Sequence, residues 1–219
     1  MKREVIRVVT PGTITSAQAL DETKNNYLMG IVYLGETDGG RRGRCHHRRF
    51  PGDGEWPPDR ALLDEIYKFS PSEIICNEAF YMSGIDLEEL KNRTSCGGDH
   101  ALEHRFFSDD SCRKLLREHF HVNHLDGLGI SQYEAGTIAA GAVLQYLYET
   151  QKSTLDHLTG ITPYTTGQYM MLDTSTRRNL ELTETLREKQ KRGTLLWVLD
   201  KTKTAMGARM LALPLWNSR

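Results

Sequence analysis

The sequence has little cysteine and no long apolar run. Four of its 219 residues are cysteines (Cys45, Cys76, Cys96 and Cys112), and no two form a CxxC pair, which excludes a disulfide scaffold and a zinc ribbon. No apolar run approaches the roughly 18 residues that span a bilayer, and the first residues, MKREVIRVV, lack the apolar core of a secretory signal. We therefore expect a cytoplasmic protein with reduced thiols and no membrane partner.

Motifs for nucleotide and nuclease chemistry are missing as well. The chain contains no GxxxxGKS or GxxxxGKT phosphate loop and no GxGxxG after a strand, so ATP hydrolysis by that route is excluded. A ribonuclease-H-like nuclease needs acids at strand ends to hold two Mg²⁺ ions. The strand expected at residues 27–34 has none, and Glu36 and Asp38 follow only in a glycine-rich turn. We expect no catalytic residue in this chain.

Two groups of residues have the spacing of metal ligands. They are Cys96, His100 and His104, and His119, His121 and His124. The first group begins with two glycines and neither has an evident fourth ligand, so we interpret both as scattered histidines and predict no metal site. Cys76 ends a short apolar strand, EIIC, and is interpreted as a core residue rather than a nucleophile.

Charge is distributed unevenly along the chain. The net charge is −1, but residues 41–49, RRGRCHHRR, contain five arginines and no acid. Outside this run 23 Lys and Arg face 29 Asp and Glu, a net charge of −6, so most of the surface would repel nucleic acid. Any contact with DNA must therefore be local.

The hydrophobic periodicity predicts an α/β domain followed by helices. Strands are predicted at residues 4–9, at 27–34 (apolar throughout and therefore central in a sheet) and at 73–76. Helices are predicted at 60–69, 86–92, 109–120 and 131–150, then at 174–189, 194–201 and 204–212 before Pro214. The clearest is 131–150, where Ser131 and Glu134 have capping-box spacing and Ile138 and Tyr146 share one face.

A composition shift marks a domain boundary near residue 160. Residues 151–168 are rich in Ser, Thr, Gly and Pro, and the pattern beyond them is helical only. We therefore expect an α/β domain joined to the beginning of a helical domain. That second part has about 55 residues, too few to bury its own apolar faces, so the chain is expected to be a fragment.

Two stretches of the helical part stand out. Residues 172–192 contain six positive charges, at Arg177, Arg178, Arg187, Lys189, Lys191 and Arg192. Two interpretations remain open for this segment: a DNA-backbone contact, and a solvated helix with ion pairs four residues apart. Leu180 and Leu186 are predicted to face inward. In residues 195–211 an apolar patch precedes Gly207, which is small enough to admit another helix, and this indicates packing.

Taken together, these stretches resemble the MutS family of DNA mismatch repair proteins. The signature DTSTRRNLEL (173–182) followed by GTLLWVLDKTKTAMGARML (193–211) is similar to the start of the MutS core domain. The segment VVTPGT (8–13) is similar to the junction between the mismatch-binding and connector domains. Sequence similar to the MutS connector occurs at 25–28, 69–80 and 134–158.

The resemblance implies a domain organisation and a set of residues. A ribonuclease-H-like connector domain would occupy residues 13–160, after the end of the mismatch-binding domain at 1–12 and before a truncated helical core (lever) domain at 161–219. The signature residues of the core are Asp173, Thr176, Arg177, Arg178, Asn179, Leu180, Asp200, Met206, Gly207 and Arg209. The candidates for DNA-backbone contacts are Arg177, Arg178, Lys201 and Lys203.

The resemblance also implies what the parent protein does. The parent would recognise mismatched DNA and couple recognition to ATP binding and hydrolysis, through an ATPase domain that holds ATP and Mg²⁺ and forms a homodimer. Nothing here matches the phenylalanine and glutamate that read the mispair. The connector would be a non-catalytic coupler and a surface for MutL, and the helix at 131–150 is our candidate for the stiff element that transmits the change.

Residues 37–58 depart from the family, which places two strands there. Residues 41–54 can be back-translated into codons that, read one base out of frame, encode GVAVAATTGDFLVT, a sequence that resembles the family. The last five residues, treated in the same way, also give a sequence that resembles the family. We hypothesise that both segments are out-of-frame translation products, so that 37–58 is irregular and lies near exposed apolar surface. An alternative function stays open, in which the chain is a self-standing basic DNA-binding module that acts through Arg41–Arg49.

Overall fold

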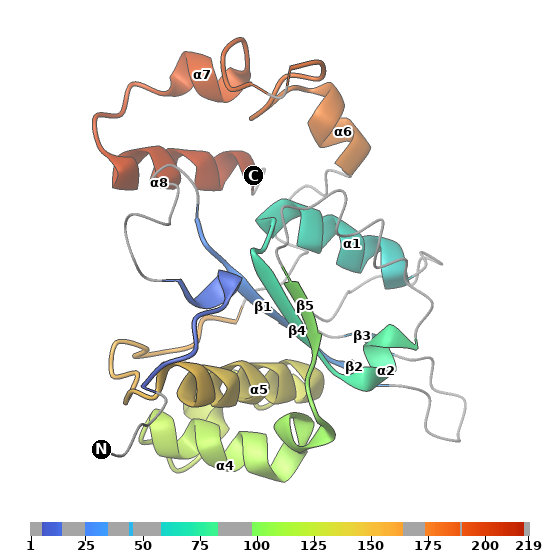
Figure 1. Cartoon of the computed structure of the whole chain (residues 1–219), viewed down its shortest axis with the longest axis vertical. Helices are drawn as coiled ribbons and strands as arrows, with labels where there is room; N and C mark the ends of the chain where they lie inside the picture. Colours follow the sequence, from blue (N-terminus) through green and yellow to red (C-terminus); the bar gives the residue numbers. More distant parts are fainter. Residues whose placement is uncertain are drawn as a thin grey trace.

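The computed structural model describes residues 6–14, 25–34, 44–45, 58–82, 98–163, 174–188 and 190–216. These residues form a small parallel sheet with helices on both faces, and a further group of helices follows from residue 174 on (Figure 1). In this described part, no helix has both the length and the apolar character needed to cross a membrane.

The main sheet has three parallel strands in the order β1-β4-β5. They are Leu28–Ile31 (β1), Glu73–Cys76 (β4) and Gly98–Ala101 (β5). The prediction of a strand at 73–76 is confirmed, and this strand is the middle one because it pairs on both sides. The prediction that the strand at 27–34 is central is wrong among the described strands, where β1 lies at the edge of this sheet.

The strand predicted at 27–34 is interrupted at Val32. Beyond the break, Tyr33–Leu34 (β2) forms a separate two-stranded sheet. The Asn77 side chain explains the change of partner, because its Oδ1 accepts from the Tyr33 amide (3.0 Å) and its Nδ2 donates to the Tyr33 carbonyl (2.8 Å). A side-chain amide thus replaces the next backbone unit of β4.

The partner of β2 is Arg44–Cys45 (β3), which pairs with it in antiparallel fashion. This two-residue strand is a regular element within 37–58, which we expected to be irregular. Apart from β3 and residue 58, that segment lies outside the described residues, as does the helix predicted at 86–92.

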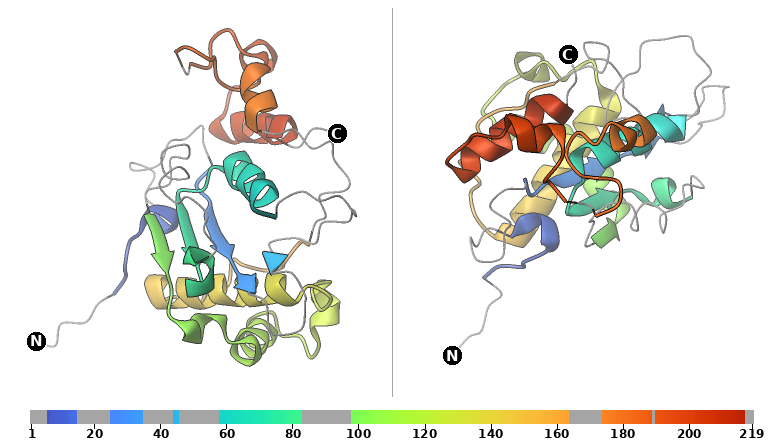
Figure 2. Two further views of the ribbon diagram at one scale, coloured as in Figure 1. Left: turned by 90° about the vertical axis from the view of Figure 1, so that its right-hand side faces the viewer. Right: turned by 90° about the horizontal axis from the view of Figure 1, so that it is seen from above.

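Helices cover both faces of the main sheet (Figure 2). α1 (Pro58–Phe69) packs on one face, and α5 (Glu134–Gln151) packs on the other with α4 (Asp109–His119) behind it, so the helices predicted at 60–69 and 109–120 are confirmed.

The core on the α1 side includes Met29, Ile31, Leu62, Ile66, Ile74, Cys76 and Phe80. The core on the α5 side includes Val32, Ile75, Phe106, Phe107, Cys112, Ile138, Ala142 and Tyr146. Short elements connect these layers: η1 (Pro11–Thr13), α2 (Glu78–Tyr81), η3 (His104–Phe107) and η4 (Leu125–Leu128).

α5 is one uninterrupted helix of 18 residues, as predicted, but its start differs from the prediction. Tyr133 is the N-cap residue and no side chain caps the helix there, so Ser131 and Glu134 do not form the expected capping box. The first turn is instead held by Thr137, whose hydroxyl donates to the Ile130 carbonyl (2.9 Å). Because Ile130 is buried, tertiary packing rather than a local cap positions this end.

The strand predicted at residues 4–9 is not observed in residues 6–9. Ile6 and Val9 are exposed, by 85% and 62%, so no second layer covers them. The Val8 amide donates to the Thr150 carbonyl in the last turn of α5 (2.8 Å). The segment therefore ends on a helix terminus, where one free carbonyl accepts it, rather than on a sheet edge.

The helices after residue 174 differ in length from those predicted. α6 (Thr174–Asn179) is much shorter than 174–189, and α7 (Leu195–Leu199) agrees with 194–201. α8 (Ala205–Trp216) continues past the expected end at residue 212 and includes Pro214. A proline so near a helix end removes few hydrogen bonds, which explains why α8 tolerates it.

α6 stops early because the chain turns sharply at Glu181, which has a left-handed φ of 45°. The carbonyls of Glu181 and Leu182 then accept from the amides of Leu195 and Leu196, at 3.4 and 2.9 Å, which ties the turn to α7. Leu180 and Leu186 are 54% and 41% exposed, so the prediction that they face inward is wrong.

Candidate functional site at the domain junction

A buried carboxylate joins the N-terminal segment to the sheet and to α5. Glu73, the first residue of β4, is fully buried, and three groups in the described part of the chain donate to it. The Tyr146 phenol donates to Oε1 (2.5 Å), while the Thr10 hydroxyl and the Gly12 amide donate to Oε2 (2.6 and 2.8 Å). One side chain thus links three segments that are far apart in the sequence. We call Thr10, Gly12, Glu73 and Tyr146 the junction cluster.

The turn Pro11–Thr13 (η1) explains how the N-terminal segment reaches Glu73. Thr10 is its N-cap residue, and the Thr13 hydroxyl accepts from the Thr10 amide (2.9 Å). Only glycine fits at the middle position, because a Cβ on Gly12 would lie 2.8 Å from Glu73 Oε2 and 2.9 Å from Glu73 Cβ. The short sequence TPGT therefore creates both the turn and the close approach.

Burial determines the electrostatics of the junction cluster. Desolvation, together with the hydrogen bond to Glu73, raises the pKa of Tyr146 to about 12. The phenol is therefore neutral near pH 7 and keeps its proton for Glu73. A polar group buried in this way is stabilising only while its partners are present.

The last turn of α5 makes a further contact with the same segment. Thr150 accepts the Val8 amide through its carbonyl, and its hydroxyl donates to the Tyr146 carbonyl (2.8 Å). α5 therefore holds residues 8–13 at two points four residues apart. Glu73 was not among the residues predicted from the sequence, although a charged residue at the start of the apolar strand EIIC was the available signal.

A second polar arrangement lies between α7 and α8. Asp200 Oδ2 pairs with Lys191, and its Oδ1 accepts from the amide and the hydroxyl of Thr202 (3.0 and 2.6 Å). The hydrogen bond from Lys191 has the largest effect on the pKa of Asp200 and, together with those from Thr202, holds it well below its usual range. Lys201 and Lys203 on the same turn are exposed, so their ammonium groups are accessible.

Comparison with known proteins shows the family of this chain. The family model described as MutS domain II matches residues 43–159, and that described as MutS domain III matches residues 175–215. The DNA mismatch repair protein MutS of Lachnoclostridium phytofermentans is 56% identical over 214 residues, 96% of this chain. This chain belongs to the MutS family. The MutS proteins of Ruminiclostridium cellulolyticum and Acetivibrio thermocellus are 42% and 41% identical over 96% of the chain.

The chain spans about a quarter of the length of its MutS relatives, since the matched region makes up 22% of the first of these three proteins and 24% of the other two. The family assignment made from the signature stretches is therefore confirmed. The domain boundaries at residues 12 and 160 stay predictions.

The MutS signature residues lie on the helical part. Thr176, Arg178 and Asn179 of α6 are exposed, and Arg177 belongs to the same helix, whereas Asp173 lies outside the described residues. Met206 of α8 is 70% exposed, and Arg209 is half-buried. The Gly207 amide donates to the Thr204 hydroxyl at the start of α8 (3.1 Å).

Several large apolar residues around this MutS signature are exposed rather than packed. Large side chains exposed by 43% to 70% are Leu180, Leu195, Trp197, Val198, Leu199, Met206 and Met210. For these described side chains, the prediction that this part cannot bury its own apolar faces is confirmed, and the packing predicted within 195–211 is not observed.

The DNA-backbone candidates do not converge on one element. Arg178 lies on α6, and Lys201 and Lys203 lie on the turn between α7 and α8. All three are exposed, which a phosphate contact requires.

Several of the candidates for metal ligands are exposed or have hydrogen-bond partners in the protein. Among the described residues, no three His, Cys, Asp or Glu side chains form a group that could hold a metal ion. Both ring nitrogens of His119 have hydrogen-bond partners, whereas His121 and His124 are exposed, and Cys96 lies outside the described part. Cys76 is fully buried in the core beside α1, as predicted.

Proposed function

We propose that this chain is the non-catalytic connector of a MutS-type DNA mismatch repair protein together with the start of its core. In the parent protein it links the mismatch-binding end with the ATPase end, and so couples recognition of mismatched DNA to ATP binding and hydrolysis. The junction cluster carries this proposal. Through Glu73, it ties residues 8–13 to the sheet and to α5.

The junction cluster suits a part that transmits movement. A displacement of residues 8–13 must either move β4 and α5 with it or break the hydrogen bonds to Glu73 and Thr150. Because these bonds are largely buried, breaking them without replacement is costly. Movement is therefore passed on, and α5 is the stiff element that carries it across the domain.

The finer fold assignment is part of the same proposal. Three parallel strands in the order β1-β4-β5 with helices on both faces support a ribonuclease-H-like connector. The acid-free strand β1 and the engagement of Glu73 by three donors support a connector that does not cut nucleic acid.

The partners of the parent are proposed on the family assignment. Mismatched DNA would contact the exposed candidates Arg178, Lys201 and Lys203, with Arg177 on the same helix. ATP and Mg²⁺ would bind the ATPase part of the parent, which also forms the homodimer, in the cytoplasm. The connector would dock MutL when ATP is bound.

A chimaera tests the coupling role. Residues 6–216 replace the matching region of the Lachnoclostridium phytofermentans MutS, and ATP-driven release of a mismatched duplex is measured. We expect Glu73→Gln and Tyr146→Phe to slow release at unchanged ATPase activity, whereas Glu118→Gln, on the exposed side of α4, leaves release unaffected. Normal release in both junction variants would contradict the proposal.

A further inference from the structure

After α5 the chain turns back across α4 and α5 along residues 152–161, which we call the strap. Lys152 and Leu155 adopt left-handed φ angles of 52° and 55°. Neither is glycine, so the strap is held in a strained backbone conformation. The strain is greatest at Leu155, because a bulky branched side chain rarely adopts this region.

Leu155 is held there by its side chain. It is 3% exposed and belongs to the core cluster of Leu116, Leu125, Ile130 and Leu144. Leu158 and Ile161 pack against the same cluster and are partly buried. Apolar contact therefore opposes the strain along the strap.

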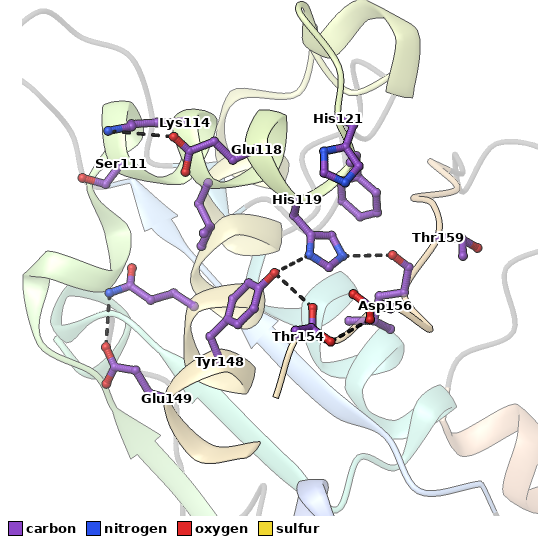
Figure 3. A pocket seen from close by; sticks show the side chains of 14 residues that line it. Ser111, Lys114, Glu118, His119, His121, Tyr148, Glu149, Thr154, Asp156 and Thr159 are labelled. Carbon is purple, nitrogen blue, oxygen red and sulfur yellow. Dashed lines mark hydrogen bonds and ion pairs between the residues drawn. The ribbon is translucent and has the colours of Figure 1, made fainter. Parts of the chain in front are cut away.

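One imidazole provides a polar contact between the strap and the helices. His119, the last residue of α4, lies between Tyr148 of α5 and the strap (Figure 3). Its Nδ1 is 2.6 Å from the Tyr148 hydroxyl, and its Nε2 is 2.9 Å from the Leu158 carbonyl. The Tyr148 hydroxyl also lies 3.3 Å from the Thr154 carbonyl.

The number of N–H and O–H protons on His119 and Tyr148 limits how many hydrogen bonds they can donate to the strap. The carbonyls of Leu158 and Thr154 only accept, so Nε2 of His119 must donate to Leu158. In a neutral imidazole Nδ1 then accepts from Tyr148, and the single phenolic proton cannot also serve Thr154. Among the described residues, His119 and Tyr148 thus hold the strap through one full hydrogen bond and one shared one.

The contact is also accessible. His119 and Tyr148 line a cavity of about 960 Å³ with Thr154, Asp156 and Leu158 of the strap. Thr154 and Asp156 are exposed, and their own hydrogen bond (2.7 Å) lies within the strap. Water can therefore replace the bonds to His119 once the strap lifts.

We propose that the strap can detach from α4 and α5 while both helices stay folded. The hydrogen bond from His119 keeps the strap closed, and the strained backbone at Lys152 and Leu155 favours its opening. This inference does not depend on the coupling role of the chain. The strap covers the last residues of the matched MutS domain II, which ends at residue 159, and lies before the matched domain III, which begins at residue 175.

Hydrogen exchange followed by mass spectrometry on the full chain tests the proposal, because exchange through local opening reports the opening equilibrium of each segment. The amide of Leu158, bonded to the Leu155 carbonyl (2.9 Å), reports on the strap, and peptides within 138–148 report on α5. We expect strap peptides to exchange faster than α5 peptides in the unmodified chain.

Variants then separate the effect of the His119 contact on the strap from a change in the stability of the whole domain. His119→Ala should raise strap exchange roughly five- to tenfold and leave α5 exchange unchanged, because it removes the bond to Leu158. His119→Gln, which restores a donor and an acceptor, should recover part of the protection. The matched control His124→Ala, an exposed histidine after α4, should change neither segment.

Lys152→Gly tests the strain independently and keeps the proposal falsifiable if His119→Ala does not fold. Glycine adopts the left-handed region without penalty, so strap exchange should slow by a factor of about two to five. Equal exchange rates of strap and α5 in the unmodified chain would overturn the proposal. So would a uniform change across the whole domain in His119→Ala.

Discussion

Gly141 of α5 lies directly against Cys112 of α4. A Cβ at residue 141 would be 2.3 Å from Cys112 Cβ and 2.8 Å from its Sγ. Cys112 is itself buried, and its thiol donates to the Phe106 carbonyl (3.1 Å). The two helices therefore meet where Gly141 has no side chain and the buried Cys112 has no room to move away.

We expect Gly141→Ala to destabilise the domain although alanine favours helices. Steric overlap with Cys112 should lower the free energy of unfolding by about 1–3 kcal/mol. Gly136→Ala, in the same helix, places its methyl 3.3 Å from Tyr133 Cβ and should change stability by less than about 1 kcal/mol. Urea unfolding of both variants measures the difference, and equal stabilities would refute the packing argument.

Tyr146→Phe should weaken the junction. The substitution leaves Oε1 of the buried Glu73 without its 2.5 Å donor, so we expect a loss of about 1–3 kcal/mol in unfolding free energy. Tyr133→Phe removes the same hydroxyl from a half-buried tyrosine at the opposite end of α5 and should cost less than about 0.5 kcal/mol. Thermal unfolding followed by circular dichroism distinguishes the two.

Stability should fall at alkaline pH. Burial raises the pKa of Cys112 from 9.0 to about 11, with Asp109 adding to the effect, and burial raises that of Tyr146 from 10.0 to about 12. The unfolded chain then releases each proton first, so these contributions are complete below pH 9 and are lost as pH rises to 12. Unfolding free energies measured across this range should decrease.

Tyr146→Phe provides the control for the alkaline effect. Its stability should vary less with pH than that of the unmodified chain, above all between pH 11 and 12, where the Cys112 contribution has ended. Identical pH profiles for the two proteins would show that the phenol does not titrate as a buried group.

The arginine run decides between the two proposed roles of the chain. If the chain is a connector, replacing Arg41, Arg42, Arg44, Arg48 and Arg49 by glutamine should leave the salt dependence of DNA binding unchanged. A self-standing basic module would instead lose most of its affinity, and the slope of log K against log salt would drop by up to about one for each phosphate contact removed. Fluorescence anisotropy at several salt concentrations measures this.

The strands and helices with strong periodicity were predictable, and their partners were not. Residues 73–76 and 131–150 have patterns that local propensity and burial both favour, and the structure contains a strand and a helix there. The departure of β2 from the main sheet depended on Asn77, a residue 44 positions beyond the Tyr33 backbone that it binds. No local pattern contains that information.

The sequence by itself determined the family, the α/β order and the lack of nucleotide motifs, because these depend on residue identity and short-range spacing. Only the tertiary structure decided that Glu73 receives Thr10, Gly12 and Tyr146. Segments separated by more than 60 residues meet there, and a buried carboxylate is stable only where folding brings donors to it. The junction therefore results from long-range packing, whereas the elements that build it follow from local preference.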